Sequence, residues 1–171
     1  MIVRKGILVD KKDEKLVDFA KLWLAHDGLW FQAIEKKYGI EEAIELDKQA
    51  WSMFSPIEAK RIMARLGMKP GGGIEALVKA LGERLYEQIN EQEVIEADDD
   101  HAIFMMKRCR VQDARQRKGM ASFPCKDVGL VEYTEFARAI DPRIETKCIT
   151  CPPDDYNGEY WCMWEFSIDG K

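Results

Sequence analysis

The spacing of apolar residues changes near residue 93, and this change constrains the fold more than any other feature of the chain. Before it, apolar side chains recur every three or four residues, which is the period of an amphipathic helix. After it, short apolar segments lie between turn residues, as expected for strands. The sequence therefore predicts a helical part over 1–92 and a mixed part over 93–171. The length of 171 residues fits a single domain over 1–171.

Turn and capping residues divide the helical part into four predicted helices. Gly39 is expected to end the first. The run Ser55-Pro56-Ile57-Glu58 is typical of a capping box with proline at the first helical position, so a new helix is expected there. A glycine-rich linker over 69–73 precedes the last helix, whose apolar face runs from Ile74 to Ile89.

The second part reads as β-β-α-α-β-β. The predicted strands cover 93–97, 102–107, 143–149 and 160–168, and the predicted helices cover 111–118 and 126–140. The first two strands flank the turn Asp98-Asp99-Asp100. We expect an α+β fold, in which an N-terminal layer of four helices packs on a small four-stranded antiparallel sheet with two further helices.

Charge and hydropathy exclude several classes of protein. The net charge of −5 argues against a nucleic-acid partner, because phosphate binding favours basic surfaces. No apolar run approaches the roughly 18 residues that cross a bilayer, so no membrane partner is expected. The first ten residues lack the continuous apolar segment of a signal peptide. We therefore expect a prokaryotic cytoplasmic location.

Two aspartates interrupt the apolar stripes of the first two helices. Asp27 lies beside Trp30 in the first stripe, and Asp47 lies beside Trp51 in the second. A helical hairpin through Gly39 would leave the two carboxyls offset by about one turn, so both are expected to face one interior site. Each is either an internal ion pair or hydrogen bond, or a pocket acid that acts as a general base, a metal ligand or an orienting group.

His26 lies at the edge of the first stripe, next to Asp27. It is either a histidine at the edge of the core whose hydrogen bonds are satisfied, or a participant in the same site. Trp30 and Trp51 are candidates for the wall of an apolar cavity, although tryptophans at this spacing also suit a plain core. A largely apolar pocket with a few convergent polar groups is the usual form of a small-molecule site.

All five cysteines lie in the second part. In a reducing cytosol they favour metal binding or thiol chemistry over disulfides. Cys109 and Cys125 each precede a predicted helix, where the helix dipole is expected to lower the pKa of the thiol. Cys148 and Cys151 form a C-x2-C knuckle. The four could bind zinc or an iron–sulfur cluster, and free or catalytic thiols are the alternative.

Cys162 belongs to the last predicted strand, where alternation places it on the same face as Trp164. It is expected to be either a small buried core residue or a thiol that lines an aromatic pocket.

Two sets of motifs resemble known families. The cysteine-containing part carries Lys107-Arg108-Cys109 at a strand end, Cys125-Lys-Asp127, Gly158, Cys162 and Phe166. This set resembles the L-2-amino-thiazoline-4-carboxylic acid hydrolase-like family. The helical part carries His26-Asp27-Gly28-Leu29-Trp30-Phe31, Glu45-Leu46-Asp47 and Trp51. This second set resembles a related uncharacterised prokaryotic family. The layout is similar, more loosely, to the vinyl-four-reductase-type ligand-binding fold.

These resemblances imply a helical layer over a small antiparallel sheet, with cysteines near a pocket. The hydrolase-like resemblance further implies opening of a cyclic C–N bond in a sulfur heterocycle. The positions that match are Cys109, Cys125, Asp127 and Cys162.

Three hypotheses follow. The first is a small-molecule-binding protein with a cysteine-based zinc or iron–sulfur site. The second is a hydrolase of a small cyclic substrate, with Cys109 or Cys125 as nucleophile and Asp27 or Asp127 as proton shuttle. The third is a structural or oligomerisation protein that forms a homodimer through its aromatic helices.

Overall fold

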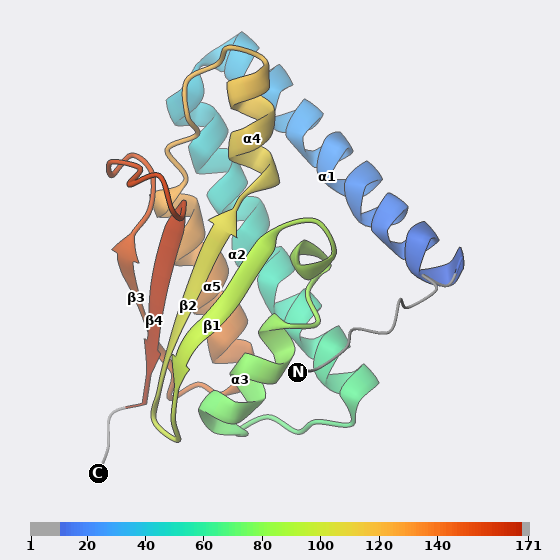
Figure 1. Cartoon of the computed structure of the whole chain (residues 1–171), viewed down its shortest axis with the longest axis vertical. Helices are drawn as coiled ribbons and strands as arrows, with labels where there is room; N and C mark the ends of the chain where they lie inside the picture. Colours follow the sequence, from blue (N-terminus) through green and yellow to red (C-terminus); the bar gives the residue numbers. More distant parts are fainter. Residues whose placement is uncertain (1–10, 169–171) are drawn as a thin grey trace, which may run out of the picture.

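The computed structural model describes residues 11–168 as a mixed helical and sheet structure. Its elements are α1 (Lys11–Tyr38), α2 (Ile40–Leu66), α3 (Gly73–Leu81), the short 3₁₀ helix η1 (Leu85–Gln88), β1 (Glu91–Ala97), β2 (His101–Arg108), α4 (Arg110–Arg117), α5 (Lys126–Ile140), β3 (Glu145–Thr150) and β4 (Cys162–Ser167). The predicted α+β class is confirmed, as are the four strands and the two helices between them (Figure 1).

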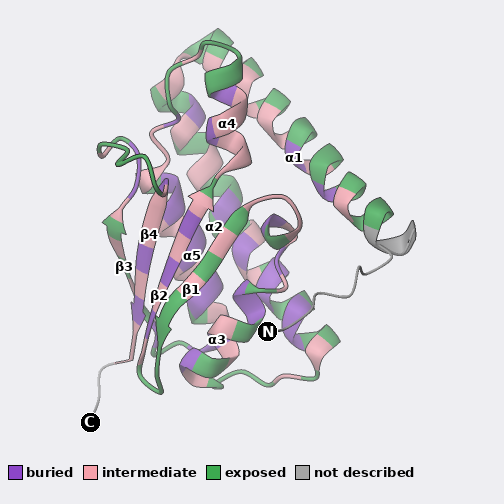
Figure 2. Ribbon diagram, viewed as in Figure 1, coloured by how far each residue is buried: buried purple, intermediate pink, exposed green. Residues whose placement is uncertain are grey.

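The four strands form one antiparallel sheet in the order β1-β2-β4-β3. In the centre, Ala102 on β2 lies opposite Phe166 on β4, and Phe104 lies opposite Trp164. Successive side chains of a strand point to opposite faces, so these four residues share one face. All four are buried in the main core, and this face is the one that the helices cover (Figure 2).

Helix α5 packs against both β3 and α2 and is central to the core. Its residue Gly129 lies directly on Trp164: a Cβ atom at this position would be 2.6 Å from Cζ2 of the indole. The absence of a side chain therefore allows α5 to approach β4 closely, and this contact places the first turns of α5 beside the site described below.

Helix α2 runs without a break through the segment where a new helix was expected. The prediction of a helix start at Ser55 was wrong, because Pro56 lies inside α2. An internal proline removes one backbone hydrogen bond and crowds the preceding turn. Trp51 and Ala59, on either side of it, are both buried. Their packing favours one continuous helix despite the lost bond.

The helix predicted to run from Ile74 to Ile89 is divided into α3 and η1. Helix α3 ends at Leu81, and Arg84 takes an extended backbone with ψ of 154° before η1 begins. This bend turns Arg84 into the protein, where its side chain is 3% exposed. The N-terminal layer is therefore three α-helices and a 3₁₀ turn.

Helices α1 and α2 meet at Gly39, and α1 diverges from the body of the molecule towards its N-terminal end (Figure 1). It contributes to a second, smaller core cluster whose buried members are Leu24, Trp51, Tyr86, Phe123 and Val128. Within residues 11–168, no helix combines the length and apolar character that a bilayer span requires.

Candidate functional site

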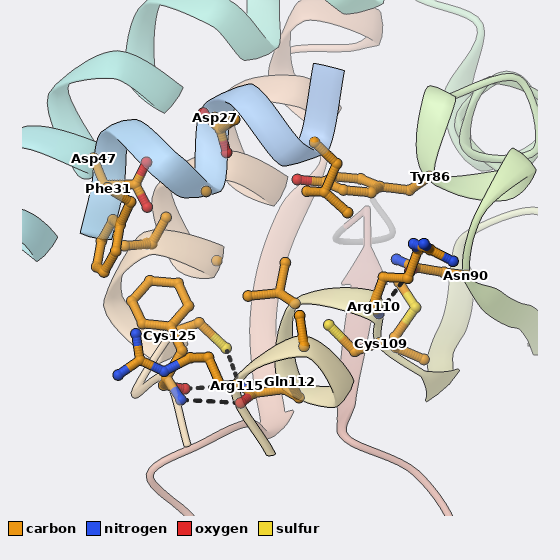
Figure 3. Close-up of a pocket in the computed structure, with 18 of the residues that line it drawn as sticks. Asp27, Phe31, Asp47, Tyr86, Asn90, Cys109, Arg110, Gln112, Arg115 and Cys125 are labelled. Carbon is orange, nitrogen blue, oxygen red and sulfur yellow. Dashed lines mark hydrogen bonds between the residues drawn. The ribbon is translucent and has the colours of Figure 1, made fainter. Parts of the chain in front are cut away.

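A cavity of about 410 Å³ lies beside this second cluster. Its wall is formed by α1, α2, α4 and α5, together with η1 and the ends of β2 and β4 (Figure 3). Most of the wall is apolar or aromatic, including Leu24, Phe31, Trp51, Tyr86 and Val128. Both the size and the character of this cavity are typical of sites for small organic molecules.

Asp27 on α1 and Asp47 on α2 both line this cavity, as the interrupted apolar stripes predicted (Figure 3). Both are half-buried. Among the described residues, no lysine or arginine forms an ion pair with either carboxylate. Both carboxyls therefore lie on the cavity wall, and the ion-pair alternative is not found among the described residues.

Burial disfavours the charged form of both carboxyls. It raises the pKa of Asp27, against a smaller opposing effect of His26. Burial also raises the pKa of Asp47 to about 7, and the negative charges of Asp27 and Glu132 act in the same direction. A hydrogen bond from Trp51 opposes this shift.

Glu132 on α5 is the third carboxyl on the wall, and it belongs to a buried ionic cluster. Nη2 of Arg84 lies 2.7 Å from Oε1 of Glu132, and Nε of Arg84 lies 2.8 Å from Oε2 of Glu58. Burial works against the charge of Arg84, but the two carboxylates outweigh it and raise the pKa of the guanidinium. This cluster joins α2, α5 and the bend before η1.

Aromatic rings surround the same guanidinium. Cζ of Arg84 lies 5.9 Å from the ring centroid of Trp51, 5.4 Å from that of Tyr86 and 5.5 Å from that of Tyr133. These three rings also line the cavity. One end of the cavity is thus built from aromatic rings and carboxyls around a buried cation.

Helix α4 is held over the cavity by two buried polar side chains. The amide of Gln112 bonds the backbone of Phe123 twice, at 2.8 and 2.9 Å. The guanidinium of Arg115 bonds both carboxylate oxygens of Glu35 at 2.8 Å, and its Nε donates to the Ala121 carbonyl at 2.7 Å. These bonds tie α4 to α1 and to the loop that precedes α5.

Four of the five thiols line the cavity: Cys109, Cys125, Cys151 and Cys162. The Sγ atoms of Cys125 and Cys151 are 3.6 Å apart, and Cys151 also hydrogen-bonds Cys162. Cys148 does not belong to this group. It lies opposite Trp164 in the sheet and packs on the main core, and a register shift separates it from the end of β3.

Three of the four predicted metal ligands, Cys109, Cys125 and Cys151, therefore share the cavity wall. Cys148 is not on the cavity wall, whereas the other end of the C-x2-C knuckle, Cys151, lines it. Within the described part of the chain, no group of three histidine, cysteine or acidic side chains has the arrangement needed to hold a metal ion.

The position of two thiols at helix starts is as predicted, but the expected effect on their acidity is not found for Cys109. Cys109 precedes α4 and Cys125 precedes α5. Burial raises the pKa of Cys109 well above its usual range, so desolvation outweighs the helix dipole. Hydrogen bonds with Cys125 and Cys162 raise the pKa of Cys151, and burial raises that of Cys148 to about 11.

Besides Cys148, three predicted site residues lie outside the cavity. Trp30 is 62% exposed, and His26 is exposed beside it on the outer side of α1. Asp127 is exposed in the first turn of α5. The apolar stripe of α1 is wider than the part of this helix that the rest of the protein covers. The edge of the stripe therefore remains in solvent.

Sequence reasoning missed Arg84, Gln112, Arg115 and Glu132. Glu132 could have been found by the argument used for Asp27, because Val128 and Phe136 lie four residues to either side of it and are buried. No periodic signal marks the other three.

The fold and the cavity together define an α+β domain with a largely apolar interior cavity. The chain belongs to DUF6125, a family of unknown function whose model matches residues 7–168. That family is not the hydrolase-like one that the cysteine motifs resemble. No curated protein matches the chain.

Two solved structures are similar to this one. The phenol-responsive sensory domain of the transcription activator PoxR, in complex with phenol, has a TM-score of 0.58 and 15% identity, over 84% of this chain and 73% of that one. A trafficking protein particle complex subunit 3 from Naegleria fowleri, covalently bound to palmitic acid, has a TM-score of 0.49 and 7% identity, over 93% of this chain and 96% of that one. The first likeness shows a shared fold.

Proposed function

We propose that this protein binds a small, largely apolar molecule in the cavity between α1, α2, α4 and α5. The observation that carries the proposal is the cavity itself, with about 410 Å³ of space, a mostly apolar wall and a few convergent polar groups. The likeness to the phenol-responsive domain of PoxR supports it, because a related fold serves there as a ligand-binding sensor.

Binding fits the side chains of the cavity better than hydrolysis does. A cysteine hydrolase needs a thiolate, and burial keeps Cys109 protonated by raising its pKa. Of the two proton shuttles of the hydrolase hypothesis, Asp27 lines the cavity but Asp127, the one that matches the hydrolase-like family, is exposed outside it. The metal site of the first hypothesis stays a prediction and is not part of the proposal, since Cys148 is not on the cavity wall.

Calorimetry and thermal shift with 1-naphthalenemethanol, a neutral bicyclic alcohol, test the proposal. We expect saturable binding and a higher melting temperature, because a ligand that binds only the folded state stabilises it. The substitution Val111→Trp places a large ring in the cavity wall and should abolish binding.

The matched control is Ile149→Trp on the exposed side of β3. It adds the same ring away from the cavity and should leave binding unchanged. Equal binding by the two variants would place the ligand elsewhere and refute the proposal.

A further inference from the structure

We propose that the ligand of this cavity joins an apolar, ring-sized body to a protonated amine, and that Asp27 and Asp47 receive the ammonium group. This inference rests on the proposed function and names the chemical class of the ligand. Four features of the cavity support it. They are the two unpaired carboxyls, the depth at which charged side chains lie on the wall, the aromatic rings near the carboxyls, and the pairing or solvent exposure of the basic residues.

The two carboxyls are acidic groups of the wall with unused binding capacity. Asp27 and Asp47 come from separate helices and face one space. Burial raises the pKa of Asp47, and the charge of Asp27 adds to that effect. Neither has a lysine or arginine partner within the described residues. A cation placed between them would relieve their mutual repulsion and supply the missing partner.

The basic residues of the wall do not supply that partner. Lys21, Arg117 and Lys118 are exposed at the rim, where water screens their charge. Lys118 already donates to Gln32 at 3.0 Å. The buried base, Arg115, has its guanidinium committed to Glu35 and to a backbone carbonyl.

How deeply each charged side chain of the wall is buried therefore decides whether the cavity favours a cationic or an anionic ligand. Charges in a poorly solvated site interact several times more strongly than charges at the surface. Of the half-buried charged side chains on the wall, Asp27, Asp47 and Arg110 have no ion-pair partner among residues 11–168, so the acids with capacity to spare outnumber the one such base. Arg110 lies at the start of α4 beside Asn90, apart from Asp27 and Asp47 (Figure 3). The other basic residues of the wall are solvated or paired. An ammonium group inside the cavity gains more than a carboxylate held at its rim.

The rings at the acidic end are also suited to a cation. Trp51 and Tyr86 line the cavity and already lie near the Arg84 guanidinium. Aromatic faces attract lysine, arginine and ligand ammonium groups through the ring quadrupole. The internal arrangement around Arg84 shows that this part of the molecule accommodates positive charge among rings and carboxylates.

Three probes with the same bicyclic body test the inference by calorimetry: 1-naphthylmethylamine, 1-naphthalenemethanol and 1-naphthoic acid. They place an ammonium, a hydroxyl and a carboxylate on one scaffold. We expect the amine to bind the wild-type protein at least tenfold more tightly than the alcohol, and the acid to bind most weakly.

Variants assign that preference to the two carboxyls. The double substitution Asp27→Asn with Asp47→Asn should reduce the preference for the amine to within about twofold while the alcohol still binds. Retained binding of the alcohol shows that the variant is folded. The control Asp127→Asn removes an equal charge from an exposed acid outside the cavity and should keep the full preference.

The outcomes separate the two proposals. Equal affinity for amine and alcohol would overturn the inference and leave the proposed function standing. Tightest binding of the acid would also overturn it, and would assign recognition to the basic rim. If none of the three probes binds, both the inference and the proposed function fail. A preference that survives the double substitution would show that other groups receive the amine.

Discussion

Asp47 occupies a place where its charge is unfavourable, and this makes the stability of the protein depend on pH. Burial raises its pKa to about 7 in the folded state, from the usual value of 3.8. The folded protein therefore binds a proton that the unfolded chain has already lost between these values. As pH rises from about 4 to 7, this site alone should lower the free energy of unfolding by up to about 4 kcal/mol.

The substitution Asp47→Asn removes that penalty, because an amide carries no charge at any of these pH values. We expect the variant to be more stable than the wild type at pH 8 and similar to it at pH 4. Urea denaturation at both pH values measures the difference. Asp127→Asn, at an exposed position, is the control and should change little at either pH. An effect of Asp47→Asn that is the same at pH 4 and pH 8 would contradict the assignment.

Arg84 has the opposite role, since it compensates buried charge. The substitution Arg84→Met would leave Glu58 and Glu132 buried without their cation. We expect the free energy of unfolding to fall by about 3–5 kcal/mol, the usual cost of breaking a buried pair from one side. Chemical denaturation measures it.

Arg65→Met is the matched comparison, because Arg65 pairs with Glu83 at the exposed surface. Its cost should stay below about 1 kcal/mol. Similar losses in the two variants would show that the Arg84 cluster contributes no more than a surface pair.

The residues that sequence reasoning found and missed differ in a physical way. A charged residue inside an apolar stripe must face the interior, so Asp27 and Asp47 were placed correctly from periodicity alone. Arg84 follows a helix that ends earlier than its apolar pattern suggests, and its direction depends on Glu58 and Glu132, which are distant in sequence. The same applies to the thiols: position at a helix start was predictable, but burial, which dominates the pKa of Cys109, was not.

At the scale of elements, α2 contains a local conflict between backbone preference and packing. Pro56 costs a helix interior roughly 3 kcal/mol relative to alanine. Part of this cost is offset because proline also restricts the unfolded chain. We expect Pro56→Ala to raise the free energy of unfolding by about 1–2 kcal/mol, measured by urea denaturation.

Pro70→Ala provides the comparison for Pro56→Ala, because Pro70 lies in the loop between α2 and α3. There the gain in freedom of the unfolded chain is not balanced by a restored helical bond, so stability should stay the same or fall slightly. A loss of stability in Pro56→Ala would mean that the ring packs against its neighbours more favourably than we infer.

Strands and helices after residue 90 were predicted closely because their signals are local. The turn of three aspartates fixes the first hairpin, and the runs around 126–140 and 160–168 have one dominant period each. Helix α2 shows the limit of this reasoning. Ser55-Pro56 is a valid local start signal, and only the packing of Trp51 and Ala59 on either side of it decides that the helix continues.

At the scale of the whole molecule, α1 presents two different surfaces. Its inner surface lines the cavity, whereas its outer surface exposes four large apolar side chains: Leu16, Phe19, Leu22 and Trp30. The homodimer predicted from the aromatic helices stays a prediction, and this outer surface is where such a dimer would form. Light scattering after size exclusion should then give twice the mass of one chain, and Phe19→Lys should reduce it to one chain. A single-chain mass in the wild type would rule the dimer out.

The cavity depends on how α1 is held to the rest of the molecule, and the bonds that hold it are few. Glu35 on α1 receives both bonds of the Arg115 guanidinium, and the ring of Phe31 lies 4.7 Å from that of Phe123. Hydrogen bonding to Arg115 lowers the pKa of Glu35, so the stability that this pair contributes is present above the usual glutamate pKa of 4.5 and is lost as pH falls through the lower folded value.

Removing the ion pair between Glu35 and Arg115 should open the cavity without unfolding the sheet. We expect Glu35→Gln to increase amide hydrogen exchange in the second half of α1 and to weaken binding of 1-naphthalenemethanol, while β2 and β4 keep their protection. Glu42→Gln, at an exposed position on α2, removes the same charge and should change neither quantity. Unchanged exchange in Glu35→Gln would show that α1 is held by its apolar contacts alone. In that case the buried polar side chains of α4 would shape the cavity wall but would not control access to it.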